Sequence, residues 1–393
     1  MKNAVGPVNG DQASVVDTPY MALWQRGECR LPAHTLLAWA QAQRLLPLLL
    51  WRAQQAGWEF PATFVHAAQA ARYHVQAQQV VAEQQLRALG AVAQKLQIPL
   101  VLVKGACVAH TYPETWLRPY VDIDLLIAEE SLAALLPALR DEGYTWLDAS
   151  TGQRGWHMPP LAPQTAGVKV EIHTALARER GRSLFTCEQW AAGLRPFDPF
   201  PGLWVPGPVE HALYLIHHAI VHHALTLGLL HFVDLKFWTQ SWGEAEWQAL
   251  VVQARTFDLH RATGLALALA AWAWDTPWPV EVQQLFPLPP DEILATAQRI
   301  VTGENVQKLP RVQRDLTERN LRGVLQYLAL VLFGDPATRQ ALPRKEKIRF
   351  YLRRPFQLLS SHGPTLWRLA RGEQRTRDAW QAQQRLHVWL DDE

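Results

Sequence analysis

Apolar positions between residues 32 and 97 recur with a helical period, and the segment is rich in Ala, Gln and Leu with few β-branched residues. The stretch AAQAARYHVQAQQVVAEQQLRALGAVAQKL, residues 67–96, predicts one long amphipathic helix. Pro99 then marks the end of that helix, because proline cannot continue it. The sequence therefore predicts an N-terminal helical region over residues 32–97, preceded by a flexible segment at 1–31.

The patterning changes between residues 98 and 173, where short β-rich runs alternate with a helical one. The clear strands are expected at 98–103, 121–127 and 168–173, and a helix at 131–144 that closes near Gly143. Two weaker strand candidates, 144–147 and 154–158, are expected to form a hairpin. These elements predict an α/β core over residues 98–200.

Proline and glycine cluster in RPFDPFPGLWVPGP, residues 195–208, which favours a domain boundary there. Beyond it, in a C-terminal region spanning 201–393, helices are expected at 209–240, 244–275, 290–305, 313–334 and 365–390. The overall prediction is an α+β fold, in which a small mixed β-sheet carries flanking helices and a largely helical C-terminal region follows.

Composition narrows the class of protein. With 393 residues, 49% hydrophobic residues and a net charge of +2, the chain can bury a core and has no global field that selects nucleic acid or membrane. Three separated cysteines indicate neither a disulfide framework nor a zinc site, and no apolar run reaches the length of a membrane span, so a cytoplasmic protein is expected. Residues 344–377 hold ten Lys or Arg against two acids, which suits either an RNA backbone or a solvated helix face.

Acidic residues interrupt two of the predicted strands. Residues two apart on a strand point to the same face, so Asp122 and Asp124 project together, as do Lys169, Glu171 and His173. If the two strands are neighbours, three carboxylates converge into a hard-oxygen site suited to Mg²⁺, and to two such ions when a phosphate bridges them. The alternative is an ordinary half-exposed sheet whose acids face solvent.

The segment upstream favours the first interpretation. A buried strand runs into Lys104 and Gly105, and Arg118 lies four residues before Asp122. Glycine permits close backbone approach, and the two cations are suited to phosphate. A strand, a glycine turn and a second strand with an Asp-x-Asp pattern would together cradle a nucleoside triphosphate.

Residues 101–130 and 168–178, VLVKGACVAHTYPETWLRPYVDIDLLIAEE and VKVEIHTALAR, resemble the uncharacterised nucleotidyltransferase family of the DNA polymerase beta superfamily. The shared pattern is Lys-Gly, an Arg shortly before Asp-x-Asp, and a later strand ending in Glu-x-His. The histidine-rich segment 211–238 is also similar to that family's second half. The resemblance extends over roughly residues 35–280 and implies a nucleotidyltransferase sheet with helices on one side.

On that resemblance, Asp122, Asp124 and Glu171 are the catalytic residues and the ligands of two Mg²⁺ ions, and Glu171 also helps to deprotonate an acceptor hydroxyl. The implied reaction moves an NMP group from an NTP, ATP being the first choice, to a hydroxyl with release of pyrophosphate. The acceptor is left open among a small molecule, a peptide and RNA.

The resemblance also implies a nucleotide-binding set. It places Lys104 and Arg118 on the triphosphate charge, Gly105 in the turn beneath it, and His173 beside Glu171 or the substrate. Ala106 follows Gly105 where the wider superfamily favours Ser, so a catalytically inactive nucleotide-binding or protein-interaction module of the same fold stays as the alternative. A metal hydrolase built on HHAIVHH, residues 217–223, is a third hypothesis.

Overall fold

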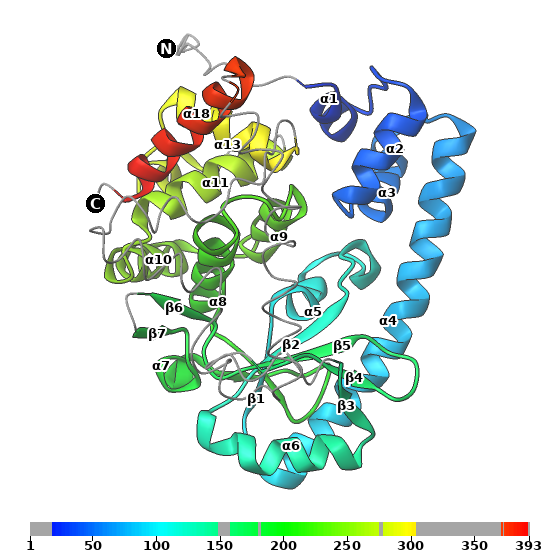
Figure 1. The fold of residues 1–393 in the computed structure, drawn as a ribbon, viewed down its shortest axis with the longest axis vertical. Coiled ribbons are helices and arrows are strands. Elements are labelled where there is room, and N and C mark those ends of the chain that lie inside the picture. The colour runs from blue at the N-terminus through cyan, green and yellow to red at the C-terminus, as the bar shows by residue number, and fades with distance from the viewer. Residues whose placement is uncertain are drawn as a thin grey trace, which may run out of the picture.

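The computed structural model describes residues 18–147, 158–179, 182–274, 278–303, 371 and 373–391. Within them a mixed β-sheet lies between two layers of helices, and a mostly helical C-terminal region stacks beyond one of its faces (Figure 1). The α+β prediction is therefore confirmed. Residues 154–157 of the second hairpin strand, the helix expected at 313–334 and most of the basic segment 344–377 lie outside the described residues.

Four helices precede the sheet: α1 (Pro19–Arg26), α2 (Ala33–Ala42), α3 (Leu46–Ala56) and α4 (Ala62–Leu96). The prediction of one long helix ahead of Pro99 is confirmed by α4, which runs from the N-terminal helices down to the sheet (Figure 1). Helix α1 lies in the segment expected to be flexible. That expectation was wrong there, because Thr18 caps the helix, Gly27 closes it at φ 72°, and its apolar side is buried.

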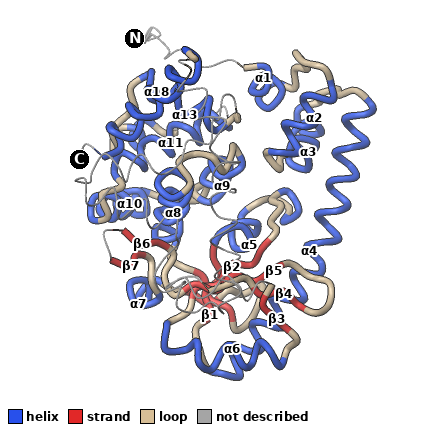
Figure 2. Tube along the Cα trace, viewed as in Figure 1, coloured by secondary structure: helices blue, strands red, loops and turns tan. Residues whose placement is uncertain are grey.

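The sheet has seven strands in the order β3-β4-β5-β2-β1-β9-β8. Their bounds are β1 (Leu100–Val103), β2 (Asp122–Leu126), β3 (Tyr144–Trp146), β4 (Leu161–Pro163), β5 (Lys169–His173), β8 (Arg195–Pro196) and β9 (Leu203–Val205). The central strand β2 pairs antiparallel with β1 and parallel with β5. Figure 2 shows the strands gathered at one level of the molecule, with a separate hairpin of β6 (Ala177–Glu179) and β7 (Arg182–Leu184) beside them.

Two details of the sheet differ from the sequence prediction. The partner of β3 is β4, at 161–163, rather than the run that ends at Met158. The Pro- and Gly-rich segment 195–208, favoured as a boundary, contributes β8 and β9 to the sheet, and β9 pairs parallel with β1. Such short strands between prolines carry no periodic signal, and only their pairing with distant residues defines them.

Helices cover both faces of the sheet, whereas the resemblance implied helices on one side. Leu102, Ile123 and Ile172 point to one face, where the C-terminal half of α4 and α6 (Leu132–Asp141) bury them. Val103 and Leu126 point to the other face and join a larger core with the N-terminal and C-terminal helices. The acids of β2 share this second face, where Asp124 is buried and Asp122 is partly exposed.

The C-terminal region packs against the N-terminal helices. It comprises α8 (Pro208–Ile216), a π-helix (His217–His222), α9 (Leu230–Trp238), α10 (Glu244–Thr256), α11 (His260–Trp274), α12 (Val280–Gln283), α13 (Asp291–Val301) and α18 (Gln374–Asp391). The Trp24 indole of α1 donates a hydrogen bond to the carbonyl of Ala273 in α11, and Gln25 donates to that of Trp272 at 2.5 Å. Trp24 thus acts as a large aromatic filler between helices.

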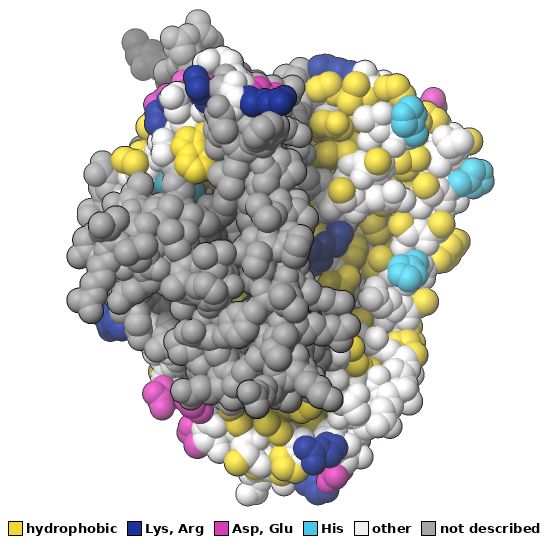
Figure 3. All heavy atoms as spheres, in the orientation of Figure 1, with side chains coloured by type: hydrophobic (Ala, Val, Ile, Leu, Met, Phe, Trp, Pro, Cys, Tyr) yellow, Lys and Arg dark blue, Asp and Glu magenta, His cyan; other side chains and the backbone are white. Residues whose placement is uncertain are grey.

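The face drawn in Figure 3 carries side chains of both charge signs. On the face in Figure 3, basic and acidic side chains lie near each other at the end of the molecule where α6 packs, and hydrophobic side chains lie among polar ones along α4. Among the described helices, none combines the length and the hydropathy needed to cross a bilayer.

At Gly90, helix α4 packs closely against the loop that precedes β9. A Cβ there would collide with the carbonyl oxygen of Pro201. Gly90→Ala gains about 1 kcal/mol of helix propensity but incurs overpacking of about 1–3 kcal/mol, so we expect a net loss of stability in urea denaturation. Ala91→Gly, on the exposed side of the same helix, measures the propensity term by itself. A Gly90→Ala protein more stable than wild type would contradict this packing.

Candidate active site on the acid face of the sheet

The register between β2 and β5 brings the predicted acids together. Because the strands are parallel and adjacent, Asp122 lies beside Lys169 and Asp124 beside Glu171. Side chains at paired positions share one face, so Asp122, Asp124 and Glu171 form a single group, called the acid cluster below. The convergence on which the sequence hypothesis depends is present in the fold.

Lys104 supplies a positive charge from the neighbouring strand. It follows β1 at the start of the short helix α5 (Lys104–Val108), and its Nζ lies 2.6 Å from Asp124 Oδ1. Its backbone has a left-handed φ of 55°, and its N–H donates to Nε2 of His211 in α8 at 3.0 Å. This unusual backbone, held by a buried histidine, aims the lysine at the acid cluster.

Asp124 is the most enclosed of the acids, with 2% of its surface exposed. His173 Nε2 lies 2.9 Å from the same Oδ1 that Lys104 contacts. Burial alone would raise the pKa of the Asp124 carboxyl, but Lys104 and His173 outweigh it and hold that pKa well below its usual range. Conversely, burial would lower the pKa of Lys104, and Asp124 raises it above the ordinary value. The pair is therefore ionised at neutral pH.

Lys169 occupies the space between the two remaining acids. Its Nζ lies 3.3 Å from Asp122 Oδ2 and also contacts Glu171. The pKa of Asp122 is nevertheless raised, first by burial and then by the charges of Asp124 and Glu171. Around Asp122, the negative charges of the neighbouring acids are therefore not fully neutralised by Lys169 and Lys104.

Three side chains at the site have the spacing and the chemistry of metal ligands. Ligand atoms of Asp124, Glu171 and His173 all lie within 4.8 Å of one another, which makes these three, among the described residues, the one group with metal-ligand spacing. Two carboxylates suit Mg²⁺, while the imidazole also admits transition ions such as Mn²⁺. Asp122 is outside this group but shares Lys169 with Glu171. The residues fit a divalent cation held by Asp124 and Glu171.

Arg118 is placed differently from the phosphate-binding role that the resemblance implies. Its guanidinium is buried and forms a bidentate pair with Asp234 of α9, with Nε 2.8 Å from Oδ1 and Nη2 2.7 Å from Oδ2. The Tyr112 hydroxyl donates to Oδ1 of the same Asp234 at 2.7 Å. Nη1 of Arg118 donates to the carbonyl of Pro119. The Arg118 side chain therefore joins the sheet to the C-terminal helices.

Gly105 has a packing role that follows from this pair. A Cβ at position 105 would lie 3.2 Å from Arg118 Nη1 and 3.0 Å from Cβ of Tyr120. The left-handed residue of the turn is Lys104 rather than Gly105. Gly105 thus makes room for the buried guanidinium.

Several residues that complete this region were not assigned by the sequence. Lys169 was recognised as sharing the face of Glu171, yet its position between two acids depends on the strand register. Asp234 pairs with Arg118, which lies 116 residues earlier in the chain. His211 gave no signal, because its partner Lys104 is 107 residues away.

The histidines of segment 217–223 cluster on the π-helix and after it. Rings of His218 and His223 lie 4.5 Å apart between centroids, and His231 of α9 is 6.4 Å from His218. Burial, followed by Lys104 and the neighbouring histidines, lowers the pKa of His218 well below its ordinary value. These rings are not among the described groups with metal-ligand spacing, so the hydrolase hypothesis gains no support.

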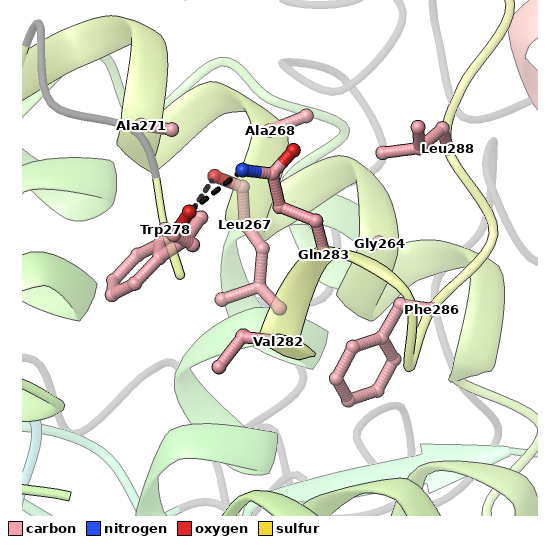
Figure 4. A pocket seen from close by; sticks show the side chains of 9 residues that line it. All are labelled: Gly264, Leu267, Ala268, Ala271, Trp278, Val282, Gln283, Phe286 and Leu288. Carbon is pink, nitrogen blue, oxygen red and sulfur yellow. Dashed lines mark hydrogen bonds between the residues drawn. The ribbon is translucent and has the colours of Figure 1, made fainter. Parts of the chain in front are cut away.

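A cavity of about 150 Å³ lies elsewhere, between α11 and α12. Figure 4 shows Leu267, Trp278, Val282 and Phe286 around it, with Gln283 donating to the carbonyl of Trp278 at 2.6 Å. The lining offers no titratable side chain. This cavity therefore has no part in the chemistry of the acid cluster.

Comparisons with known proteins agree with this geometry. A family model described as an uncharacterised nucleotidyltransferase matches residues 31–275, a range that contains the acid cluster, Lys104, Arg118 and Asp234. No curated protein and no solved structure matches the chain.

The Arg118–Asp234 pair predicts a large stability effect. Asp234→Asn leaves a buried guanidinium without its counter-charge, so we expect the free energy of unfolding to fall by about 3–5 kcal/mol in urea denaturation. Glu83→Gln is the matched control, since it breaks the exposed Glu83–Arg87 pair on α4 and should change stability by about 0.5 kcal/mol or less. Equal losses in the two variants would refute a buried, structural pair.

Proposed function

Because the chain belongs to the uncharacterised nucleotidyltransferase family, we propose that it moves an NMP group from an NTP, such as ATP, to a hydroxyl of an acceptor. The observation that carries the proposal is the parallel register that sets Asp124 beside Glu171, with Asp122 two residues away on the same face. The proposal explains why three carboxylates share a face that helices otherwise cover.

Each residue of the acid cluster has a proposed task. Asp124 and Glu171 would hold a divalent cation, Mg²⁺ being the first choice, and Asp122 would face a second ion together with the nucleotide. Lys104 and His173 keep Asp124 ionised and fix its orientation. When bound, the metal supplies charge neutralisation at the triphosphate and at the attacking oxygen.

The reaction is an in-line displacement. The acceptor oxygen attacks the α-phosphorus, the bond to the bridging β-phosphate oxygen breaks, and pyrophosphate leaves with the bonding electrons. The proton of the acceptor hydroxyl passes to Glu171. Catalysis then rests on positioning and on stabilisation of the developing charge, and the rigid sheet provides the positioning.

The second candidate is a module of the same fold that binds a nucleotide without turnover. Two observations favour it: Ala106 stands where the wider superfamily has Ser, and both nearby lysines already pair with the acids. Under the first candidate, the acceptor is a small molecule, a peptide or RNA.

Asp122→Asn tests activity with the least disturbance of the fold, because the Asp122 side chain is 29% exposed. We expect transfer of label from an α-³²P-labelled NTP, in the presence of Mg²⁺, to fall about 100-fold or more. Asp141→Asn, on the exposed end of α6, is the matched control and should transfer label as wild type does. Undiminished transfer by Asp122→Asn would remove the acid cluster from the chemistry.

A measurement of metal binding distinguishes both candidate functions from an acid cluster that has only a structural role. Titration calorimetry with Mn²⁺ should show binding to wild type and a loss of about 10- to 100-fold in affinity for Glu171→Gln, which removes a charged ligand. If Mn²⁺ and Mg-NTP bind but no pyrophosphate appears with any acceptor, the binding module is the better description. Equal Mn²⁺ affinity in both proteins would exclude Glu171 as a ligand.

A further inference from the structure

Each described cation that the fold places at the acid cluster already holds an acid. Lys104 pairs with Asp124, and Lys169 contacts both of its acidic neighbours. Arg118, four residues before Asp122 in the sequence, pairs with Asp234. A nucleoside triphosphate brings several further negative charges, and these three side chains can meet them only by releasing their partners. Beyond the divalent cation of the proposed function, a further cationic side chain would offset part of this charge.

Arg44 is such a cation, and it lies in an unusual backbone conformation. It follows Gln43, the C-cap of α2, with a left-handed φ of 57°, and the next residue, Leu45, donates its N–H to the carbonyl of Ala40 at 2.9 Å. Glycine is the usual residue at this point of a helix, because a Cβ is strained there. The fold thus keeps an arginine where backbone energetics favour glycine.

The turn that carries Arg44 is fixed against the C-terminal region on both sides. Trp39 Nε1 donates to the carbonyl of Thr302 at 2.9 Å, and Gln43 Oε1 accepts from the N–H of Leu229 at 2.8 Å. Leu229 immediately precedes α9, the helix that carries Asp234. The turn that carries Arg44 is therefore anchored beside the start of α9, and the charges of Arg118, Asp122 and Asp234 all act on Arg44.

The surroundings of Arg44 agree with this placement. Arg44 is exposed to water. Desolvation by nearby protein atoms, followed by the charge of Arg118, lowers its pKa, and the charges of Asp122 and Asp234 act in the opposite direction. Burial, followed by the charge of Arg118, lowers the pKa of His231 on α9, and the charge of Arg44 adds to that shift. Among the described residues none forms an ion pair or a side-chain hydrogen bond with Arg44. A crowded, water-accessible and unpaired guanidinium is suited to an anionic ligand.

We propose that Arg44 binds the outer phosphates of the nucleotide, so that the N-terminal helices complete a site whose acids come from the sheet. The inference rests on the proposed function and goes beyond it, because it assigns phosphate recognition to a residue outside the sequence motifs. Arg44 takes the role that the motif resemblance gives to Arg118, whose guanidinium the fold has engaged elsewhere.

Arg44→Gly tests the proposal with little risk to the fold, because glycine prefers the left-handed backbone. We expect a melting temperature equal to or above that of wild type, together with affinity for Mg-ATP reduced about 10- to 100-fold by calorimetry. Arg44→Lys should retain part of the affinity, since it keeps the charge but loses the planar fork.

Gln97→Gly is the matched control. Gln97 is exposed, ends α4 with φ 55° and lies away from the acid cluster, so its replacement relieves the same strain without removing a cation. It should bind Mg-ATP as wild type does. Inorganic tripolyphosphate is the second probe, and it should bind wild type and Gln97→Gly but bind Arg44→Gly at least tenfold more weakly.

The outcomes separate this inference from the proposed function. If Arg44→Gly binds Mg-ATP and tripolyphosphate as tightly as wild type, the role of Arg44 is overturned while nucleotide binding stands. If wild type binds neither probe, both the inference and the proposed function are overturned. A melting temperature below that of wild type, with no loss of affinity, would mark Arg44 as a packing residue and also reject the proposal.

Discussion

Asp124 is an ionised carboxylate enclosed by protein, and the sheet around it is arranged to compensate its charge. Isolated, such a group would cost several kcal/mol in a folded protein. Lys104 reaches it from the end of β1, and His173 reaches it from β5 two residues beyond the registered Glu171. A shift of β5 by one residue would turn His173 and Glu171 to the opposite face, so the register is specified by charge as well as by hydrophobic pattern.

A second buried ion pair extends this arrangement to the helices. Asp234 comes from α9 and receives Arg118 and Tyr112 from the segment between β1 and β2. The guanidinium in turn explains why position 105 carries no side chain. The C-terminal helices are therefore part of the framework that positions the acid cluster, and the shared hydrophobic core, which includes Val103 and Val233, supports the same conclusion.

The sequence predicts local features of this site and misses the long-range ones. Alternation within residues 121–127 and 168–173 was enough to place the acids on common faces, because strand period is a local property. The partner of Arg118 is 116 residues away, and its pairing depends on how α9 packs against the sheet. Similarly, Arg44 belongs to no motif, and only tertiary contacts of Gln43 bring its turn toward Asp234. The sequence predicts a boundary where β9 lies, because its pairing with the distant strand β1 leaves no local pattern.

The Arg118–Asp234 pair and the acid cluster differ in how well their charges are balanced. The Arg118–Asp234 pair is balanced, one cation to one acid with its hydrogen bonds satisfied, which is what a structural role requires. The acid cluster is unbalanced, because Asp122 has a raised pKa from burial and from its acidic neighbours even with Lys169 in contact. Stability alone does not account for carboxylates that repel one another on a covered face. In the proposed function, a bound divalent cation would relieve this repulsion, so that free energy which folding leaves unrecovered at the acid cluster would become affinity for the metal and, through it, for a triphosphate.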